Sequence, residues 1–130
     1  MSKIDQVEWA KIIIEGKEYS QVLLVGNEVI ERDSATLHQL FGTTHKMSDF
    51  EIERLLEGEP EIIIVGNGWD GALEINEKLK MKISSFAKAS EDRKKLGIEL
   101  KVLRTPEAVE EYNRLEEEGK RVNALIHTTC

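Results

Sequence analysis

A run of four large apolar residues, Ile62 to Val65, stands near the middle of the chain and leads directly into a glycine-rich segment. Isoleucine and valine are β-branched and favour strands. Apolar residues at consecutive positions indicate a strand that is buried on both faces. Gly66, Gly68 and Gly71 then permit a tight turn. We therefore expect a central strand over residues 61–65 that ends in a glycine turn.

Shorter apolar runs ahead of this strand predict an antiparallel N-terminal meander. Residues 11–15 and 19–25 are predicted strands, Gly26-Asn27 suits a two-residue turn, and Val29-Ile30 continue as a short third strand. Trp9 is expected to cover an edge of the core.

Residues 31–47 show only weak periodicity and are predicted to form a long loop. Long loops in compact domains are often functional. A short helix from Ala35 to Leu40 is the alternative.

Ser48 and Glu51 then match a capping box, in which each side chain bonds the backbone N–H of the other residue. Apolar residues on one face predict a helix over residues 49–57, and Gly58 is placed to end it.

After the glycine turn, three apolar residues alternate with lysines, which predicts a strand with one solvated face: Leu79, Met81 and Ile83. Ser84 or Ser85 can then cap a helix of about ten residues that Gly97 closes.

The C-terminal third has the clearest pattern. Residues 98–103 are a predicted strand, and Thr105 followed by Pro106 predicts the N-cap and first residue of a helix. That helix ends near Gly119, and residues 121–127 form the last predicted strand.

From residue 61 on, the predicted order is strand, strand, helix, strand, helix, strand. Strands that are separated by single helices imply parallel neighbours joined by right-handed crossovers. The meander must bury its apolar face, and the sheet face without helices offers the place. We predict one domain over residues 1–130 of the α/β class with three β/β/α layers: the antiparallel meander packs on a mostly parallel central sheet, with helices on the other face.

The composition excludes several classes of partner. The chain has 18 basic and 25 acidic residues and a net charge of −7. Nucleic acids and anionic membranes both bind basic protein surfaces, so we expect neither a nucleic acid nor a membrane as a partner. Cys130 is the single cysteine, which rules out an internal disulfide and a zinc site with several thiolates. The opening residues lack the apolar region of a secretory signal, and we expect a cytoplasmic protein.

The spacing Gly66-x-Gly68-x-x-Gly71 matches the dinucleotide-binding fingerprint. That fingerprint needs a helix directly after the glycines and an acidic residue at the end of a second strand. Neither is predicted here, so a tight turn is the favoured interpretation, and no cofactor is expected. An anion or small-molecule pocket at this end of the sheet is the remaining functional alternative. Its candidate residues are Gly66, Gly68, Trp69, Asp70, Thr105, Arg121 and His45.

His127 and Cys130 place an imidazole and a thiol three positions apart. Alternate residues of a strand face opposite sides, so the two groups converge only if the chain turns. A nucleophilic pair also needs a third group that orients the base. A strand-end histidine bonded to its surroundings is therefore the favoured interpretation, and no catalytic or metal-binding residue is predicted.

Several segments resemble one known family: Val102–Leu115, Gly119–Val122, His127–Cys130, and Gly66-x-Gly68 with Ala72-Leu73. The family comprises the adipogenesis-associated domain protein, archaeal and bacterial proteins of unassigned function, and a mitochondrial complex I assembly factor. The resemblance implies a three-layer β/β/α fold without an established activity or cofactor. It also aligns His45 with a histidine that relatives carry ahead of the first helix, and it implies that Gly71 is incidental.

We therefore expect a non-catalytic protein that acts through protein–protein contacts in assembly or regulation. The alternative is a small-molecule or anion-binding protein, or an enzyme, with its site at the Gly66–Gly71 turn. A homo-oligomer that pairs through a sheet edge is a third possibility.

Overall fold

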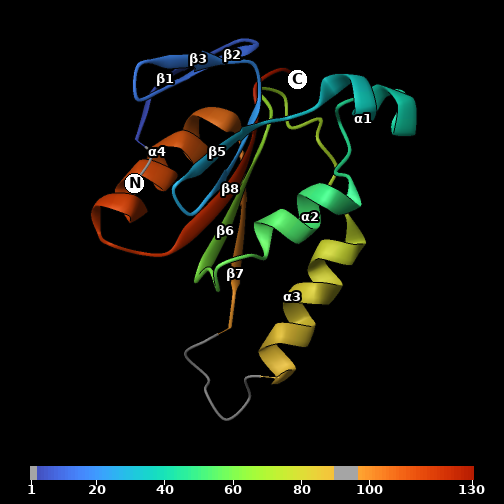
Figure 1. Ribbon diagram of the computed structural model, residues 1–130, viewed down its shortest axis with the longest axis vertical. Helices are drawn as coiled ribbons and strands as arrows, with labels where there is room; N and C mark the ends of the chain where they lie inside the picture. The colour runs from blue at the N-terminus through green and yellow to red at the C-terminus, as the bar shows by residue number, and fades with distance from the viewer. Residues whose placement is uncertain (1–2, 90–96) are drawn as a thin grey trace.

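A five-stranded mixed sheet forms the centre of the molecule. The computed structural model describes residues 3–89 and 97–130, and Figure 1 follows them from blue to red. The strands are β4 (Val22–Val25), β5 (Glu28–Glu31), β6 (Ile62–Asn67), β7 (Glu99–Leu103) and β8 (Val122–His127). Their order is β5–β4–β8–β6–β7, in which β8 pairs parallel with β6 and antiparallel with β4.

Three further strands form a separate antiparallel sheet: β1 (Ile4–Glu8), β2 (Lys11–Ile14) and β3 (Lys17–Tyr19). The predicted meander is therefore divided between two sheets, because the β4–β5 hairpin joins the central one. The central sheet is mixed and not mostly parallel, because β4 pairs antiparallel with β8. Residues on both faces of β4 are apolar and buried, which suits a strand inside the sheet. The predicted α/β class, with an antiparallel layer on a central sheet, is confirmed.

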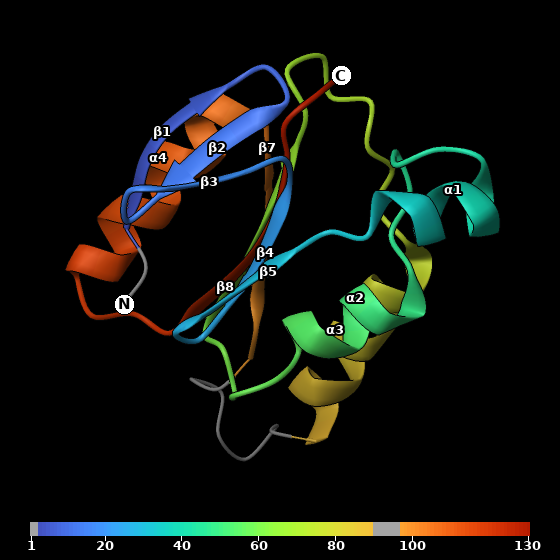
Figure 2. The ribbon, with the colours of Figure 1, turned by 45° about the horizontal axis from the view of Figure 1, so that its top comes forward.

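The N-terminal sheet shares its face of the central sheet with helix α4 (Thr105–Glu117), as Figure 2 shows. One apolar core joins them, and its fully buried members include Ile12 of β2, Ile64 of β6 and Tyr112 of α4. The expectation that all helices lie on the face opposite the meander was wrong. Trp9 also differs from its prediction, because 56% of its surface is exposed.

The other helices lie on the opposite face: α1 (Ser34–Phe41), α2 (Asp49–Leu55) and α3 (Glu77–Ala89). A second core lies beneath α2 and α3 and contains the strand residues of opposite parity, such as Ile63 and Leu125. Helix α1 confirms the short helix that was the alternative to a loop. It buries a single residue, Leu37.

The prediction of a strand around residues 79–83 was wrong, because this segment lies in α3. Leu79 is fully buried whereas 67% of Met81 is exposed, so the two residues face different sides as helical spacing requires. Lys78 and Lys82, one turn apart, form ion pairs with Asp49 and Glu53 of α2. The predicted helix that ends at Gly97 lies partly outside the described residues, and α3 already spans its first positions.

Helix α4 begins one residue earlier than the N-cap prediction. Arg104 occupies the N-cap position without a side-chain cap, and Pro106 lies in the first turn. Thr105 does not cap the helix because its hydroxyl bonds elsewhere. Gly68 N donates to it at 3.0 Å, and it donates in turn to the His127 carbonyl. The capping box of α2 is confirmed in both directions.

Candidate functional site

The glycine turn after β6 is bonded to the C-terminal segment of the chain. Trp69 N donates to the Thr129 carbonyl at 2.8 Å, and both Asp70 N and Ala72 N donate to the Cys130 main-chain oxygen at 2.9 Å. An anion bound by these amides would have to displace residues 129–130. The ligand site at the turn therefore stays a prediction, and it would require the C-terminal segment to move.

Close packing accounts for the glycines of the turn. A Cβ on Gly66 would lie 3.1 Å from the Cβ of Ala108 on α4. Gly68 has a φ of +105°, and a Cβ there would lie 2.3 Å from the main chain of Cys130. Gly71, implied to be incidental, has a φ of +75° and approaches the Arg104 side chain. These approaches explain the glycines without a nucleotide.

The remaining predicted site residues lie in two places. His45 is near the turn, where its carbonyl accepts a hydrogen bond from Glu74 N at 2.8 Å. Trp69 is partly buried and Asp70 is exposed. Arg121 lies at the other end of the parallel strands, just before β8, and donates to the Glu59 carbonyl at 2.9 Å. It does not converge with the turn.

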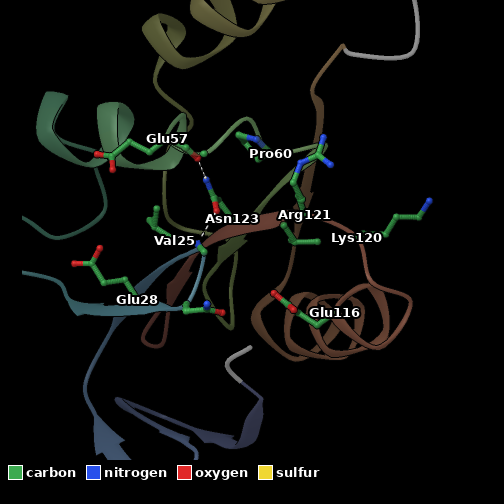
Figure 3. Close-up of a pocket in the computed structure, with 12 residues that line it drawn as sticks. Val25, Glu28, Glu57, Pro60, Glu116, Lys120, Arg121 and Asn123 are labelled. Atoms are coloured by element: carbon green, nitrogen blue, oxygen red, sulfur yellow. Dashed lines mark hydrogen bonds between the residues drawn. The ribbon is translucent and has the colours of Figure 1, made fainter.

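Arg121 lines a hollow of about 370 Å³ at that other end, together with charged side chains that include Glu57 and Lys120. Figure 3 shows these two side chains pointing away from Asn123. Asn123 is buried and donates to the Leu55 and Glu57 carbonyls at 2.8 Å, while its oxygen accepts from Gly26 N. The amide at the base of this hollow is engaged with the backbone, and it joins two turns.

A buried polar cluster that sequence reasoning missed lies at the C-terminal end of β8. The Arg32 side chain is fully buried, and its Nε donates to Glu51 Oε2 at 2.5 Å. Its Nη1 donates to Gln21 and to the Thr44 carbonyl, and its Nη2 donates to Glu51 and to the Lys46 carbonyl. All five N–H groups of the guanidinium are thus used within the chain.

His127 extends this cluster to the end of β8. Its Nδ1 lies 2.7 Å from Gln21 Oε1, which already accepts from Arg32, so Nδ1 carries the proton. Its Nε2 then accepts from the Thr129 hydroxyl at 3.1 Å. Burial, and then the charge of Arg32 and the proximity of His45, lower the pKa of His127 to about 4. The imidazole is therefore neutral at pH 7, and both of its nitrogens contact groups other than the Cys130 thiol.

An apolar groove of about 700 Å³ lies over this cluster, between α1, α2 and β5. The buried Arg32–Glu51 pair lies in its lining, and α1 and α2 supply apolar residues on either side. Leu40 is 61% exposed, Phe41 37% and Phe50 62%. Large apolar side chains gathered around a groove indicate an interaction surface.

Sequence reasoning could have found one part of this groove. The capping box placed Phe50 on the first turn of α2, and helical spacing puts it on the opposite side from the buried Ile52 and Leu55. The neighbouring α1 was only an alternative. No local spacing joins Arg32 to Glu51, since 19 positions separate them.

The part of the chain that the structure describes shows no metal-binding cluster. In residues 3–89 and 97–130, no group of three His, Cys, Asp or Glu side chains is placed to hold a metal ion. No helix of this described part is long and apolar enough to cross a bilayer.

The fold and the groove define a small mixed α/β domain with an exposed apolar surface over a buried ionic cluster. The chain belongs to the family of proteins of unknown function DUF498/DUF598, whose family model matches residues 4–127. The resemblance that the sequence suggested is supported at this coarser level.

Solved structures agree with this assignment. The chain is 29% identical to a protein named MT938 over 100% of both chains, with a TM-score of 0.72. It is 28% identical to the conserved hypothetical protein PH1505 from Pyrococcus horikoshii OT3, over 98% of this chain and 99% of that one, with a TM-score of 0.69. A protein from Bordetella pertussis that is described as an Mth938-like domain shares the fold at 18% identity, 98% and 85% coverage and a TM-score of 0.59.

Proposed function

We propose that this protein is a non-catalytic binding domain that recognises an apolar segment of another protein in the groove between α1 and α2. One observation carries the proposal: Leu40, Phe41 and Phe50 expose large apolar surfaces around a common groove. Burying a side chain of this size stabilises a complex by roughly 1.5–3 kcal/mol. Covering them together therefore offsets part of the entropy that association costs.

The exposure of these residues favours a macromolecule over a small ligand. Small-molecule sites enclose most of their ligand and orient it with a few free polar groups. Here the most polar group beneath the groove, Arg32, already bonds with Glu51, Gln21 and two carbonyls. Leu40 and Phe50 are more than half exposed, and a larger surface is needed to cover them.

The family resemblance supports the same direction. The chain resembles the adipogenesis-associated protein and a complex I assembly factor, and proteins of those kinds act in regulation and assembly. A role in assembly or regulation, carried out by binding a partner in the groove, agrees with both the resemblance and the exposed apolar surface.

The turn after β6 remains the second candidate. Trp69 Nε1 and Asn67 Oδ1 are buried there and have no hydrogen-bond partner within the described residues. A small polar ligand that reaches these atoms would supply the missing hydrogen bonds. Native mass spectrometry of protein isolated gently from its own host tests this candidate, because a bound molecule adds a few hundred daltons.

Site-specific photocrosslinking in the native host tests the proposed function. Phe50 is replaced by p-benzoylphenylalanine, and the same replacement of Trp9, which is 56% exposed on another surface, is the matched control. We expect a discrete protein adduct from the Phe50 variant that the Trp9 variant does not form. The proposal fails if the two variants give the same adducts, or if the groove variant gives none.

A further inference from the structure

The rim of the groove points to the chemistry of its occupant. Resting on the proposed function, we infer that the partner inserts an amphipathic helix whose apolar face is flanked by lysine or arginine. Charge complementarity, the shape of the groove and the net charge of the chain each support this partner.

The rim of the groove is acidic. Glu31, Asp33 and Asp49 line it together with one lysine, Lys78. Arg32 and Glu51 cancel each other beneath them, so the rim carries three negative charges against one positive charge, a net −2. The rim is therefore complementary to basic side chains.

Two of the acidic groups, Glu31 and Asp33, keep most of their capacity for a cation, whereas Asp49 already pairs with Lys78 at 3.2 Å. Glu31 accepts from the backbone and hydroxyl of Ser20, and Asp33 accepts from the backbone and hydroxyl of Thr36. These donors are neutral, so both carboxylates retain their charge toward the groove. The bonds also fix the orientation of the two side chains, which lowers the entropy lost when a partner binds.

The walls of the groove suit a helix. Leu40 and Phe41 stand on α1, and Phe50 stands on α2, so an occupant between them is contacted from both sides. A helix laid into a groove of this kind presents apolar residues at i, i+3, i+4 and i+7. Next to the groove, a second hollow of about 300 Å³ shares Asp49 and Lys78 with it and is lined by Met81. The surface thus continues from α1 across α2 to α3.

Other occupants fit the surface less well. An occupant that extends the sheet would pair with the edge of β5, whose ends carry the acidic residues Glu28 and Glu31, and charges on an edge strand oppose such pairing. A second copy of this chain would bring a further net charge of −7 against the acidic rim. An anionic lipid surface would be repelled for the same reason.

Four fluorescein-labelled peptides of about 18 residues, long enough for several helical turns, test the inference by fluorescence anisotropy. Three place leucine on one helical face and fill the other positions with lysine, glutamate or glutamine. The fourth has the lysine peptide's composition in an order that disperses its leucines. We expect the lysine peptide to bind at least tenfold more tightly than the other three, and its affinity to fall several-fold between about 50 and 500 mM salt, since salt screens exposed charges.

Two sets of variants assign the binding to the groove. The double variant Leu40→Ser/Phe50→Ser should weaken the lysine peptide at least tenfold, whereas Trp9→Ser should leave its affinity unchanged. The variant Glu31→Gln/Asp33→Asn/Asp49→Asn should weaken it several-fold, because asparagine preserves the N-cap of α1 while removing the charge. A distal triple replacement on α4 is the matched control: Glu107→Gln, Glu110→Gln and Glu117→Gln.

The outcomes separate this inference from the proposed function. If all four peptides bind equally and the Leu40→Ser/Phe50→Ser variant weakens each, the helix and its basic flank are wrong while the groove remains the binding site. If the lysine peptide does not bind, the inference is overturned, and the photocrosslinking result decides the proposed function by itself. If the groove variants bind the lysine peptide with unchanged affinity, the inference fails, and the peptides give the proposed function no support. Circular dichroism confirms that each variant is folded.

Discussion

Replacing Glu51 by glutamine should destabilise the protein severely while preserving the local geometry of α2. Glu51 is 5% exposed and Arg32 is fully buried, and their atoms approach to 2.5 and 3.1 Å. Glutamine keeps the capping-box bond to Ser48, because glutamine and glutamate both serve at this position. The substitution therefore removes the charge but retains the cap.

The magnitude follows from the guanidinium that remains. Glutamine offers Arg32 one acceptor oxygen in place of two, and its NH2 group faces an N–H donor. Removing one partner of a buried ion pair costs about 3–5 kcal/mol. For a domain of this size that corresponds to a fall in Tm of roughly 10–20 °C.

Urea unfolding followed by circular dichroism measures this loss. Glu53→Gln on the same helix is the control, since Glu53 pairs with Lys82 at 2.7 Å and both side chains are about half exposed. An exposed pair of this kind contributes about 1 kcal/mol or less. A Glu51→Gln variant that loses no more free energy of unfolding than Glu53→Gln would refute the assignment of Arg32 and Glu51 as a tightly buried pair.

Three further predictions concern other parts of the fold. Since the pKa of His127 is about 4 when folded and 6.5 when unfolded, the unfolded state binds the extra proton. The contribution of His127 to stability should therefore fall by about 2.5 kcal/mol between pH 6.5 and pH 4, and His127→Gln should remove this part of the pH dependence in denaturation curves. Gly68→Ala should destabilise the protein by more than about 3 kcal/mol, because the added Cβ would clash with the C-terminal segment. Gly58→Ala is the control, since Gly58 has a φ of +76° but lies in open space, and it should cost about 1–2 kcal/mol. Equal losses in the two variants would contradict the close packing of Gly68 against Cys130. Leu79→Glu should prevent folding while Met81→Glu changes the free energy of unfolding by less than about 0.5 kcal/mol, and similar losses in thermal melts would favour a strand.

The parts of the fold that sequence predicts well are those with strong local patterns. Ile62 to Val65 and residues 122–127 show strand burial directly, and both strands lie where two faces are covered. The capping box of α2 is equally local, because its two residues lie three positions apart. Such signals are independent of the rest of the chain.

Other parts depend on partners that are distant in sequence. The lysines of α3 alternate with apolar residues as in a strand. Only the packing of Leu79 in the second core distinguishes the helix from a strand. Thr105 followed by Pro106 predicts a cap, but the Thr105 hydroxyl bonds Gly68 and His127, which lie in other parts of the chain and leave no local signal in the sequence. Arg32 likewise lay in a segment without periodicity. The candidate groove was not predicted, because contacts between residues far apart in sequence form it.

The central place of β8 has a consequence for how the protein folds during its synthesis. The β4–β5 hairpin and the β6–β7 pair meet only through β8, so neither can join the other before residues 122–127 have been made. Until then both carry open strand edges, which are prone to pair with other chains. Contacts between residues so far apart in sequence also slow folding. The newly made chain therefore passes through a period of exposure to aggregation that ends only when β8 is inserted between the two pairs.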